Sequence, residues 1–106
     1  MKTIHSLVLL LLVLVSVSAG AAESRLERVA SGLGVPWGMV FLDADTLLFT
    51  ERAGRVGRLD IASGKPDYLG GAPRVFANGQ GGLLDVAPAP DYASNGWLYF
   101  TYSKTV

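Results

Sequence analysis

Short apolar runs, each about the length of one β-strand, alternate along the chain with polar turns. Runs of this kind, bounded by Gly, Pro, Asp and Asn, are typical of an all-β sandwich, barrel or propeller. No segment keeps a helical spacing of apolar positions for long enough to predict a helix. Five strands are therefore predicted, at residues 36–42, 46–50, 56–61, 83–87 and 97–102.

The residues between these runs predict tight turns, and hence antiparallel strands in a meander. Asp43 and Asp45, Gly54, and the Asn95-Gly96 pair lie between successive runs. The charged stretch 51–58, ERAGRVGR, is predicted to be a solvated hairpin, because glycines and an acid interrupt its arginines. This interruption argues against a nucleic-acid-binding arm.

One apolar pattern occurs twice. The stretch LLFT at 47–50 is echoed by LYFT at 98–101, an offset of 51 positions. Propeller blades repeat every 40 to 50 residues or so, and each is a four-stranded sheet that needs neighbours to cover both faces. The pattern predicts about one to one and a half blades, the N-terminal portion of a propeller truncated at its C-terminus. A self-contained small β-domain is the alternative.

The first 21 residues have the pattern of a signal peptide. Lys2 precedes an apolar stretch at 7–15, and Ala19-Gly20-Ala21 forms an A-x-A cleavage pattern. The apolar stretch is short for a bilayer core of roughly 30 Å, so no stable membrane insertion is expected. The mature domain, residues 22–106, is predicted to be periplasmic or secreted.

The composition excludes several kinds of chemistry from that domain. The 106-residue chain contains no cysteine, and its only histidine, His5, lies in the predicted signal peptide. Histidine-based acid–base catalysis and Cys or His metal sites are therefore absent from residues 22–106. Over the whole chain nine basic residues balance nine acidic ones, which gives no indication of a nucleic-acid partner. No catalytic residue is predicted within the chain.

The most distinctive local motif places Gln80 between Gly79, Gly81 and Gly82. The amide of a glutamine both donates and accepts hydrogen bonds, which suits a sugar hydroxyl or a quinone oxygen. Flanking glycines permit unusual backbone angles and close approach of a ligand. The residues alone leave a second interpretation open, in which the glycines form a tight turn before the next strand and Gln80 is merely solvated.

Other polar and aromatic residues have structural interpretations. Trp37 and Trp97 border predicted strands and are expected to pack between blades. Asp85 lies in an apolar strand, so it must be hydrogen-bonded or exposed, and Arg52 or Arg55 is its expected partner. Three further aspartates are predicted to shape turns rather than to bind calcium: Asp43, Asp45 and Asp91.

Three motifs carry a resemblance to a known family: PWG at 36–38, TER at 50–52 and GQGGLLD at 79–85. In this order and spacing, the chain resembles the N-terminal part of the glucose/sorbosone dehydrogenase family, the soluble or periplasmic aldose dehydrogenases that use pyrroloquinoline quinone (PQQ). The resemblance implies a six-bladed β-propeller with PQQ above the central channel and calcium as a second cofactor. It places Gln80 at the mouth of the active site, where it would bind substrate or cofactor.

The implied activity is oxidation of a small sugar, an aldose, at its anomeric carbon by hydride transfer to the quinone. The resemblance puts the catalytic histidine and most of the quinone and calcium ligands outside this chain, so the chain alone is expected to be inactive; it does not identify the electron acceptor. Many relatives have His-Pro-Asp where this chain has Ala89-Pro90-Asp91, a departure that bears on the subgroup. A secreted propeller that binds carbohydrate or protein without catalysis is the alternative function.

Overall fold

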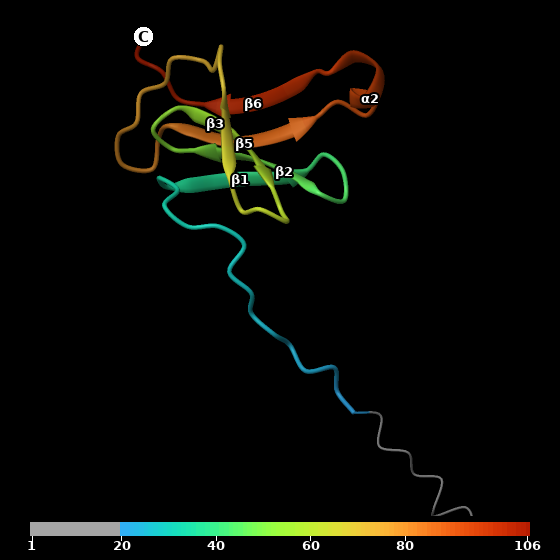
Figure 1. Cartoon of the computed structure of the whole chain (residues 1–106). Helices are drawn as coiled ribbons and strands as arrows, with labels where there is room; N and C mark the ends of the chain where they lie inside the picture. The colour runs from blue at the N-terminus through green and yellow to red at the C-terminus, as the bar shows by residue number, and fades with distance from the viewer. Residues whose placement is uncertain (1–19) are drawn as a thin grey trace, which may run out of the picture.

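The computed structural model describes residues 20–106, in which an extended segment precedes two antiparallel β-sheets (Figure 1). The signal peptide predicted at 1–21 lies almost wholly outside the described residues. Within the part of the chain that is described, no helix has the length and apolar character needed to cross a membrane.

The larger sheet has four strands in chain order, and the smaller sheet has two. Each predicted strand is present, with its ends shifted by no more than one residue. The observed elements are β1 (Pro36–Phe41), β2 (Thr46–Glu51), β3 (Arg55–Asp60), β4 (Pro66–Leu69), β5 (Leu83–Pro88), α2 (Tyr92–Asn95) and β6 (Leu98–Tyr102). The antiparallel meander is confirmed for β1 to β4, and the hairpin predicted within 51–58 turns at Gly54, where φ is 117°.

Two elements contradict the sequence prediction. Strand β4 was not predicted because it begins Pro66-Asp67, residue types that are depleted in strands, and Pro is tolerated here because β4 is an edge strand. Helix α2 is a single turn, too short to show a helical spacing of apolar residues. It ends at Gly96, whose φ of 68° only glycine adopts readily.

The β1–β2 and β5–β6 hairpins have the same register, which confirms the repeat seen in the sequence. Each contains a β-bulge at the same place, where two residues of the first strand lie opposite one residue of the second. The single residue opposite the bulge is Thr50 in one hairpin and Thr101 in the other. The equivalent pairs are Pro36–Glu51 and Leu83–Tyr102, Met39–Phe49 and Val86–Phe100, Val40–Leu48 and Ala87–Tyr99, and Phe41–Leu47 and Pro88–Leu98.

The two threonines form equivalent hydrogen bonds across their bulges. Thr50 Oγ1 accepts the Gly38 N–H at 3.0 Å, and Thr101 Oγ1 accepts the Asp85 N–H at 3.0 Å. Thr50 also donates its hydroxyl hydrogen to the carbonyl oxygen of Leu84 in β5. This second bond crosses from the first hairpin to the second, and Thr50 is fully buried whereas Thr101 is exposed.

Thr50→Val is therefore expected to lower the free energy of unfolding by about 1–3 kcal/mol, because it leaves the buried Gly38 N–H and Leu84 carbonyl without their partner. Thr101→Val makes the same change at the equivalent, exposed position, and its expected cost is below about 1 kcal/mol. Urea denaturation of both variants measures the difference. Equal losses would show that the bond between the hairpins adds no stability.

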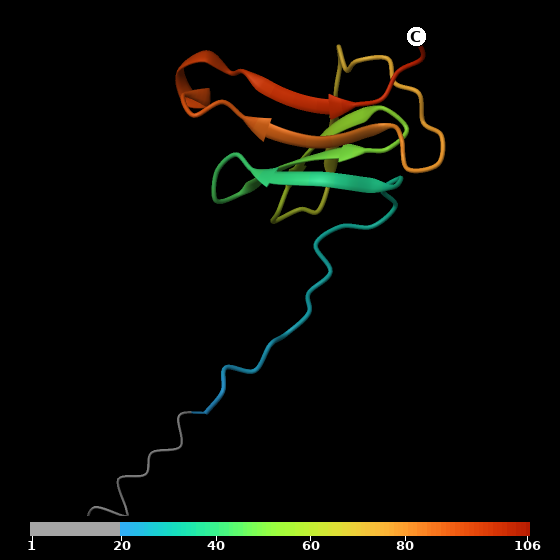
Figure 2. The ribbon, with the colours of Figure 1, turned by 180° about the vertical axis from the view of Figure 1, so that it is seen from behind.

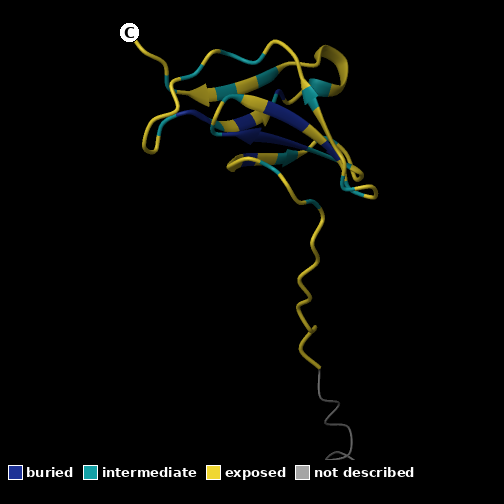
Figure 3. Ribbon diagram, turned by 60° about the vertical axis from the view of Figure 1, so that its left-hand side comes forward, coloured by how far each residue is buried: buried dark blue, intermediate teal, exposed yellow. Residues whose placement is uncertain are grey.

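The hydrophobic core lies between the two sheets. Leu48 and Val56 from the larger sheet pack against Leu83 and Val86 of β5. Strand β5 lies beside β1 in both views (Figures 1 and 2), and Figure 3 shows the buried residues gathered in the middle of the folded part. Gly38 permits this approach, because a Cβ there would lie 2.9 Å from both the Leu84 carbonyl oxygen and the Asp85 Cα.

Residues 20–106 do not bury the two tryptophans, whose packing between blades stays a prediction. Trp37 is 44% exposed and Trp97 is 63% exposed, and Trp97 precedes β6 rather than beginning it. On β1, Met39 and Phe41 are also exposed. Large apolar side chains thus remain on surfaces that no segment of residues 20–106 covers.

Candidate functional site

Gln80 belongs to the loop that leads from β4 to β5. This loop enters β5 at the end of the hairpins where β1 and β5 begin and β2 ends (Figure 1). The Gln80 side chain is exposed and has no hydrogen-bond partner among residues 20–106. The amide is consequently available to a ligand at this end of the folded part.

Each glycine around Gln80 has a structural reason. Gly79 has a φ of 55°, as the first central residue of a turn that the Gly81 N–H closes onto the Asn78 carbonyl oxygen at 2.8 Å. A Cβ at Gly81 would lie 2.7 Å from Ser103 Oγ. Gly82 has a φ of 148°, and a Cβ there would collide with the Arg52 carbonyl oxygen. The tight turn considered from the sequence is therefore present, and it presents Gln80 to solvent.

Ser103 fastens both ends of the Gln80 loop. Its hydroxyl accepts the Gly82 N–H at 2.7 Å and donates to the Phe76 carbonyl oxygen at 2.8 Å. Its backbone N–H donates to Gly82 O at 2.9 Å, while its carbonyl oxygen accepts the Phe76 N–H at 2.7 Å. Four hydrogen bonds from one residue thus fix the chain on both sides of Gln80. This role could not be predicted from the sequence, because Ser103 lies beyond the last strand and far from the loop along the chain.

Arg52 holds the loop from the other side. Its carbonyl oxygen accepts the Leu83 N–H at 2.9 Å, and its Nη1 lies 3.5 Å from Gly81 O, at the limit of a hydrogen bond. Arg52 lies in the β2–β3 turn, directly after Glu51. The position of Gln80 therefore depends on how firmly this turn is held.

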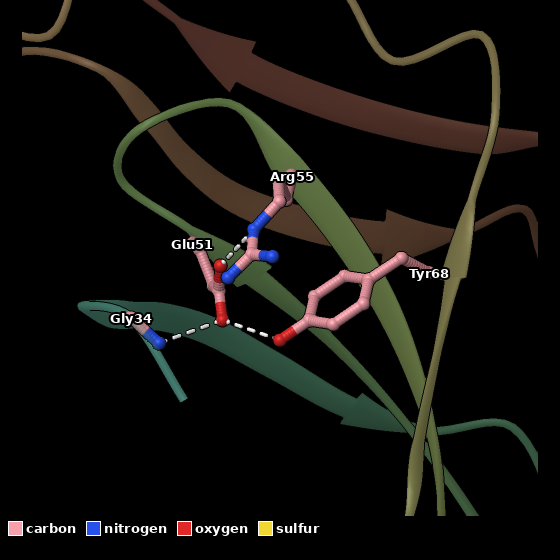
Figure 4. Close-up of polar contacts among 4 residues, drawn as sticks. All are labelled: Gly34, Glu51, Arg55 and Tyr68. Carbon is pink, nitrogen blue, oxygen red and sulfur yellow. Dashed lines mark hydrogen bonds and ion pairs between the residues drawn. The ribbon is translucent and has the colours of Figure 1, made fainter. Parts of the chain in front are cut away.

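A buried carboxylate anchors the turn. Glu51 is 1% exposed and accepts hydrogen bonds from the Gly34 N–H at 2.7 Å, Arg55 Nε at 2.6 Å and the Tyr68 hydroxyl at 2.8 Å (Figure 4). The Arg55 guanidinium lies over the Tyr68 ring, 4.1 Å from its centroid, in a cation–π contact. The cluster joins β2, β3, β4 and the segment before β1, and every buried side-chain polar atom described has a partner.

These contacts shift two pKa values. Burial raises the pKa of Glu51, but the hydrogen bonds from Gly34, Tyr68 and Arg55 outweigh it and lower the pKa overall. The pKa of Tyr68 is raised, first by its hydrogen bond to Glu51 and then by burial. Glu51 is consequently ionised and Tyr68 neutral near pH 7, and the cluster holds structure rather than carrying out proton transfer.

The other residues singled out from the sequence have local roles. Asp85 was expected to be hydrogen-bonded or exposed, and both hold: its side chain is exposed, and its Oδ1 accepts the Val86 N–H at 2.9 Å. Its expected pairing with Arg52 or Arg55 is wrong. Within the described residues the ion pairs are Arg55–Glu51 and Arg58–Asp67.

The turn roles of three aspartates are confirmed. Asp43 Oδ1 accepts the Asp45 N–H at 2.9 Å, and the Asp91 carbonyl oxygen accepts the Ser94 N–H at 2.9 Å, at the start of α2. No group of three or more His, Cys, Asp or Glu side chains in residues 20–106 is arranged to hold a metal ion. The candidate site is thus the Gln80 amide, on a loop that the hydrogen bonds of Ser103 and Arg52 hold in place.

Comparison with known proteins places these features in a family context. Residues 33–106 match the family model "Glucose / Sorbosone dehydrogenase". The chain is 38% identical over 87 residues to the aldose sugar dehydrogenase of Escherichia coli (strain K12), covering 81% of this chain and 24% of that protein. It is 39% identical over 95 residues to an uncharacterized protein of Synechocystis sp., covering 82% of this chain and 23% of that one.

Solved structures give the same picture. The PQQ-bound form of an aldose sugar dehydrogenase from Streptomyces coelicolor is 38% identical, with a TM-score of 0.72 over 76% of this chain and 25% of that one. The apo-form of the soluble aldose sugar dehydrogenase from Escherichia coli is 37% identical, with a TM-score of 0.70 over 76% of this chain and 23% of that one. The chain spans about a quarter of the length of these relatives.

Proposed function

Since the chain belongs to the glucose/sorbosone dehydrogenase family, we propose that it forms the N-terminal part of a PQQ-dependent aldose dehydrogenase. The four-stranded sheet would be the first blade of a six-bladed propeller, and the β5–β6 hairpin would begin the second. The repeated register of the two hairpins supports this assignment.

The observation that carries the proposal is the presentation of Gln80. An exposed amide without an internal partner lies on a loop that Ser103 and Arg52 fasten on both sides. Such an amide donates to one ligand oxygen and accepts from one ligand hydroxyl. A fixed loop lowers the entropy lost when the ligand binds, so Gln80 would position a sugar hydroxyl or a quinone oxygen without having to be ordered first.

PQQ, when bound, would supply the hydride acceptor for oxidation of the aldose at its anomeric carbon. The residues of this chain fit one polar edge of such a site, the Gln80 amide. Residues 20–106 contain no group of three or more His, Cys, Asp or Glu side chains arranged to hold a metal ion, and most of the calcium ligands would lie outside this chain. The base that accepts the hydroxyl proton would likewise lie outside this chain, whose contribution is to orient the ligand and form part of the wall.

We also propose that the protein is exported. The pattern at residues 1–21 supports removal of a signal peptide and a periplasmic or secreted location. Edman sequencing of the exported protein tests this, with Ala22 as the expected first residue.

Gln80→Ala, made in the longer dehydrogenase that contains this segment, is expected to lower kcat/KM for aldose oxidation by about tenfold, the value of one or two neutral hydrogen bonds. Gln80→Glu keeps an acceptor and removes both donors, so its effect shows which function of the amide matters. Lys65→Ala, in the exposed turn before β4, is the control and should leave the rate unchanged. Dye-linked sugar oxidation with and without added PQQ measures all three.

Quinone-dependent oxidation that is unaffected by Gln80→Ala would contradict the role of Gln80 and leave the enzymatic function in place. A folded, full-length protein that neither binds PQQ nor oxidises aldoses would instead support the alternative, a secreted propeller that binds carbohydrate or protein. The two results are separated by measuring PQQ binding alongside the rate.

A further inference from the structure

The sequence contains two asparagines, Asn78 and Asn95, and each is followed by glycine. An Asn-Gly pair is the sequence most prone to spontaneous rearrangement, because glycine has no Cβ to hinder its backbone nitrogen. The two pairs have the same local chemistry and lie in different structural settings. The effect of structural setting on the reactivity of an Asn-Gly pair can thus be compared within one chain.

Asn95-Gly96 is held against this reaction. The Gly96 N–H donates to the Tyr92 carbonyl oxygen at 2.8 Å at the end of α2, and Asn95 Oδ1 accepts the Trp97 N–H at 2.8 Å. The Gly96 nitrogen must leave the first bond, and the Asn95 side chain must leave the second, before the two can react. Each lost hydrogen bond raises the barrier.

Asn78-Gly79 has neither restraint. Within residues 20–106 the Gly79 N–H and the Asn78 side chain have no hydrogen-bond partner. Both residues are exposed, and the space around the Gly79 Cα is open, since a Cβ there would meet no atom within 4 Å. The bond that closes the turn uses the Asn78 carbonyl oxygen, which is not a reacting atom.

We propose that Asn78 is a site of selective, spontaneous deamidation. The Gly79 backbone nitrogen loses its proton and attacks Cγ of Asn78, and the bond from Cγ to the side-chain amide nitrogen breaks to release ammonia. Water then opens the cyclic imide at either carbonyl, which leaves an aspartate or an isoaspartate at position 78. No oxidant or reductant is consumed. Because the attacking nitrogen must lose a proton, the rate rises with pH.

The product changes the surroundings of Gln80. A carboxylate adds one negative charge two residues before Gln80, and the isoaspartate form adds a methylene to the backbone of the turn that presents it. These changes near Gln80 are expected to cause a gradual loss of aldose oxidation as position 78 is converted, an expectation that rests on the proposed function. The deamidation itself is independent of that function.

The test incubates the full chain in a mildly alkaline buffer, with a parallel sample in urea, and follows both asparagines by tandem mass spectrometry and by isoaspartyl methyltransferase labelling. In native buffer Asn78 is expected to convert at least about tenfold faster than Asn95, as two hydrogen bonds protect the latter. In urea, where neither setting persists, the two rates should become similar. Asn78→Gln, which changes an exposed side chain, should abolish the fast conversion.

Equal native rates at the two positions would overturn the proposal, as would a native preference for Asn78 no larger than that in urea. If selective conversion is found but the longer dehydrogenase keeps its rate after aging, the deamidation stands and its predicted effect on aldose oxidation fails. The two inferences are thereby tested separately.

Discussion

Glu51→Ala is expected to lower the free energy of unfolding by about 3 kcal/mol. The variant removes the acceptor for the Gly34 N–H, the Tyr68 hydroxyl and Arg55 Nε together. Gly34 and Tyr68 are then left without this acceptor beside the void left by a fully buried side chain. Urea denaturation followed by circular dichroism measures the loss.

Two matched variants separate charge from shape. Glu51→Gln keeps an oxygen acceptor in the same place and removes the charge, so its cost should be smaller than that of Glu51→Ala. Asp67→Asn removes one carboxylate from the Arg58–Asp67 pair, whose side chains are 52% and 69% exposed, and should change stability by less than about 0.5 kcal/mol. A Glu51→Ala protein as stable as Asp67→Asn would show that the cluster is dispensable.

The same carboxylate predicts a pH dependence. The pKa of Glu51 is lower in the folded chain than its ordinary value of 4.5, so the unfolded chain binds the proton more tightly. The stabilisation from this group is therefore complete above the ordinary pKa and is lost as the pH falls through the lower, folded pKa. The acid-induced loss of stability should be shallower in Glu51→Gln, which has no proton to gain at this position.

Leu83→Ala is expected to cost about 2–5 kcal/mol, because Leu83 is fully buried where β5 meets the larger sheet. Truncating it opens a cavity between the two sheets, against Leu48 and Val56. Leu26→Ala makes the same chemical change at a fully exposed position in the segment before β1 and should be nearly neutral. Urea midpoints of the two variants give the comparison.

This pair of variants also tests whether the hairpins fold as one unit. If Leu83→Ala lowers the midpoint while a single cooperative transition remains, the two sheets share one core. If the variant instead produces two separate transitions, or matches Leu26→Ala, the β5–β6 hairpin contributes no stability to the larger sheet.

The fold was largely predictable because its hairpins follow simple rules. Alternating apolar residues and short polar turns specify β1, β2, β3, β5 and β6 locally, without knowledge of distant contacts. Strand β4 escaped prediction because its pairing to β3, and not its own Pro66-Asp67 start, makes it a strand. The two tryptophans are exposed in residues 20–106 for a related reason, since burial depends on what covers a strand.

Only Gln80 and its flanking glycines could be predicted as a candidate site from the sequence. The glycines around Gln80 drew attention because they are rare in such density, and they proved to serve a turn and two close approaches. The role of Ser103 in holding the Gln80 loop could not be predicted, since its contacts are with backbone atoms far away along the chain. Glu51 was visible as part of a motif, but its burial and its three donors follow from tertiary structure.

The shared register of the two hairpins has a consequence for symmetry. The second hairpin packs onto the first with one face and presents the opposite face, where the Thr101 hydroxyl corresponds to the Thr50 hydroxyl that already bonds to Leu84. A contact between unlike faces has no two-fold axis, and its repetition gives a closed ring or an open-ended stack. The contact therefore determines which surface the next unit must present. The rotation from one unit to the next determines how many units close the ring.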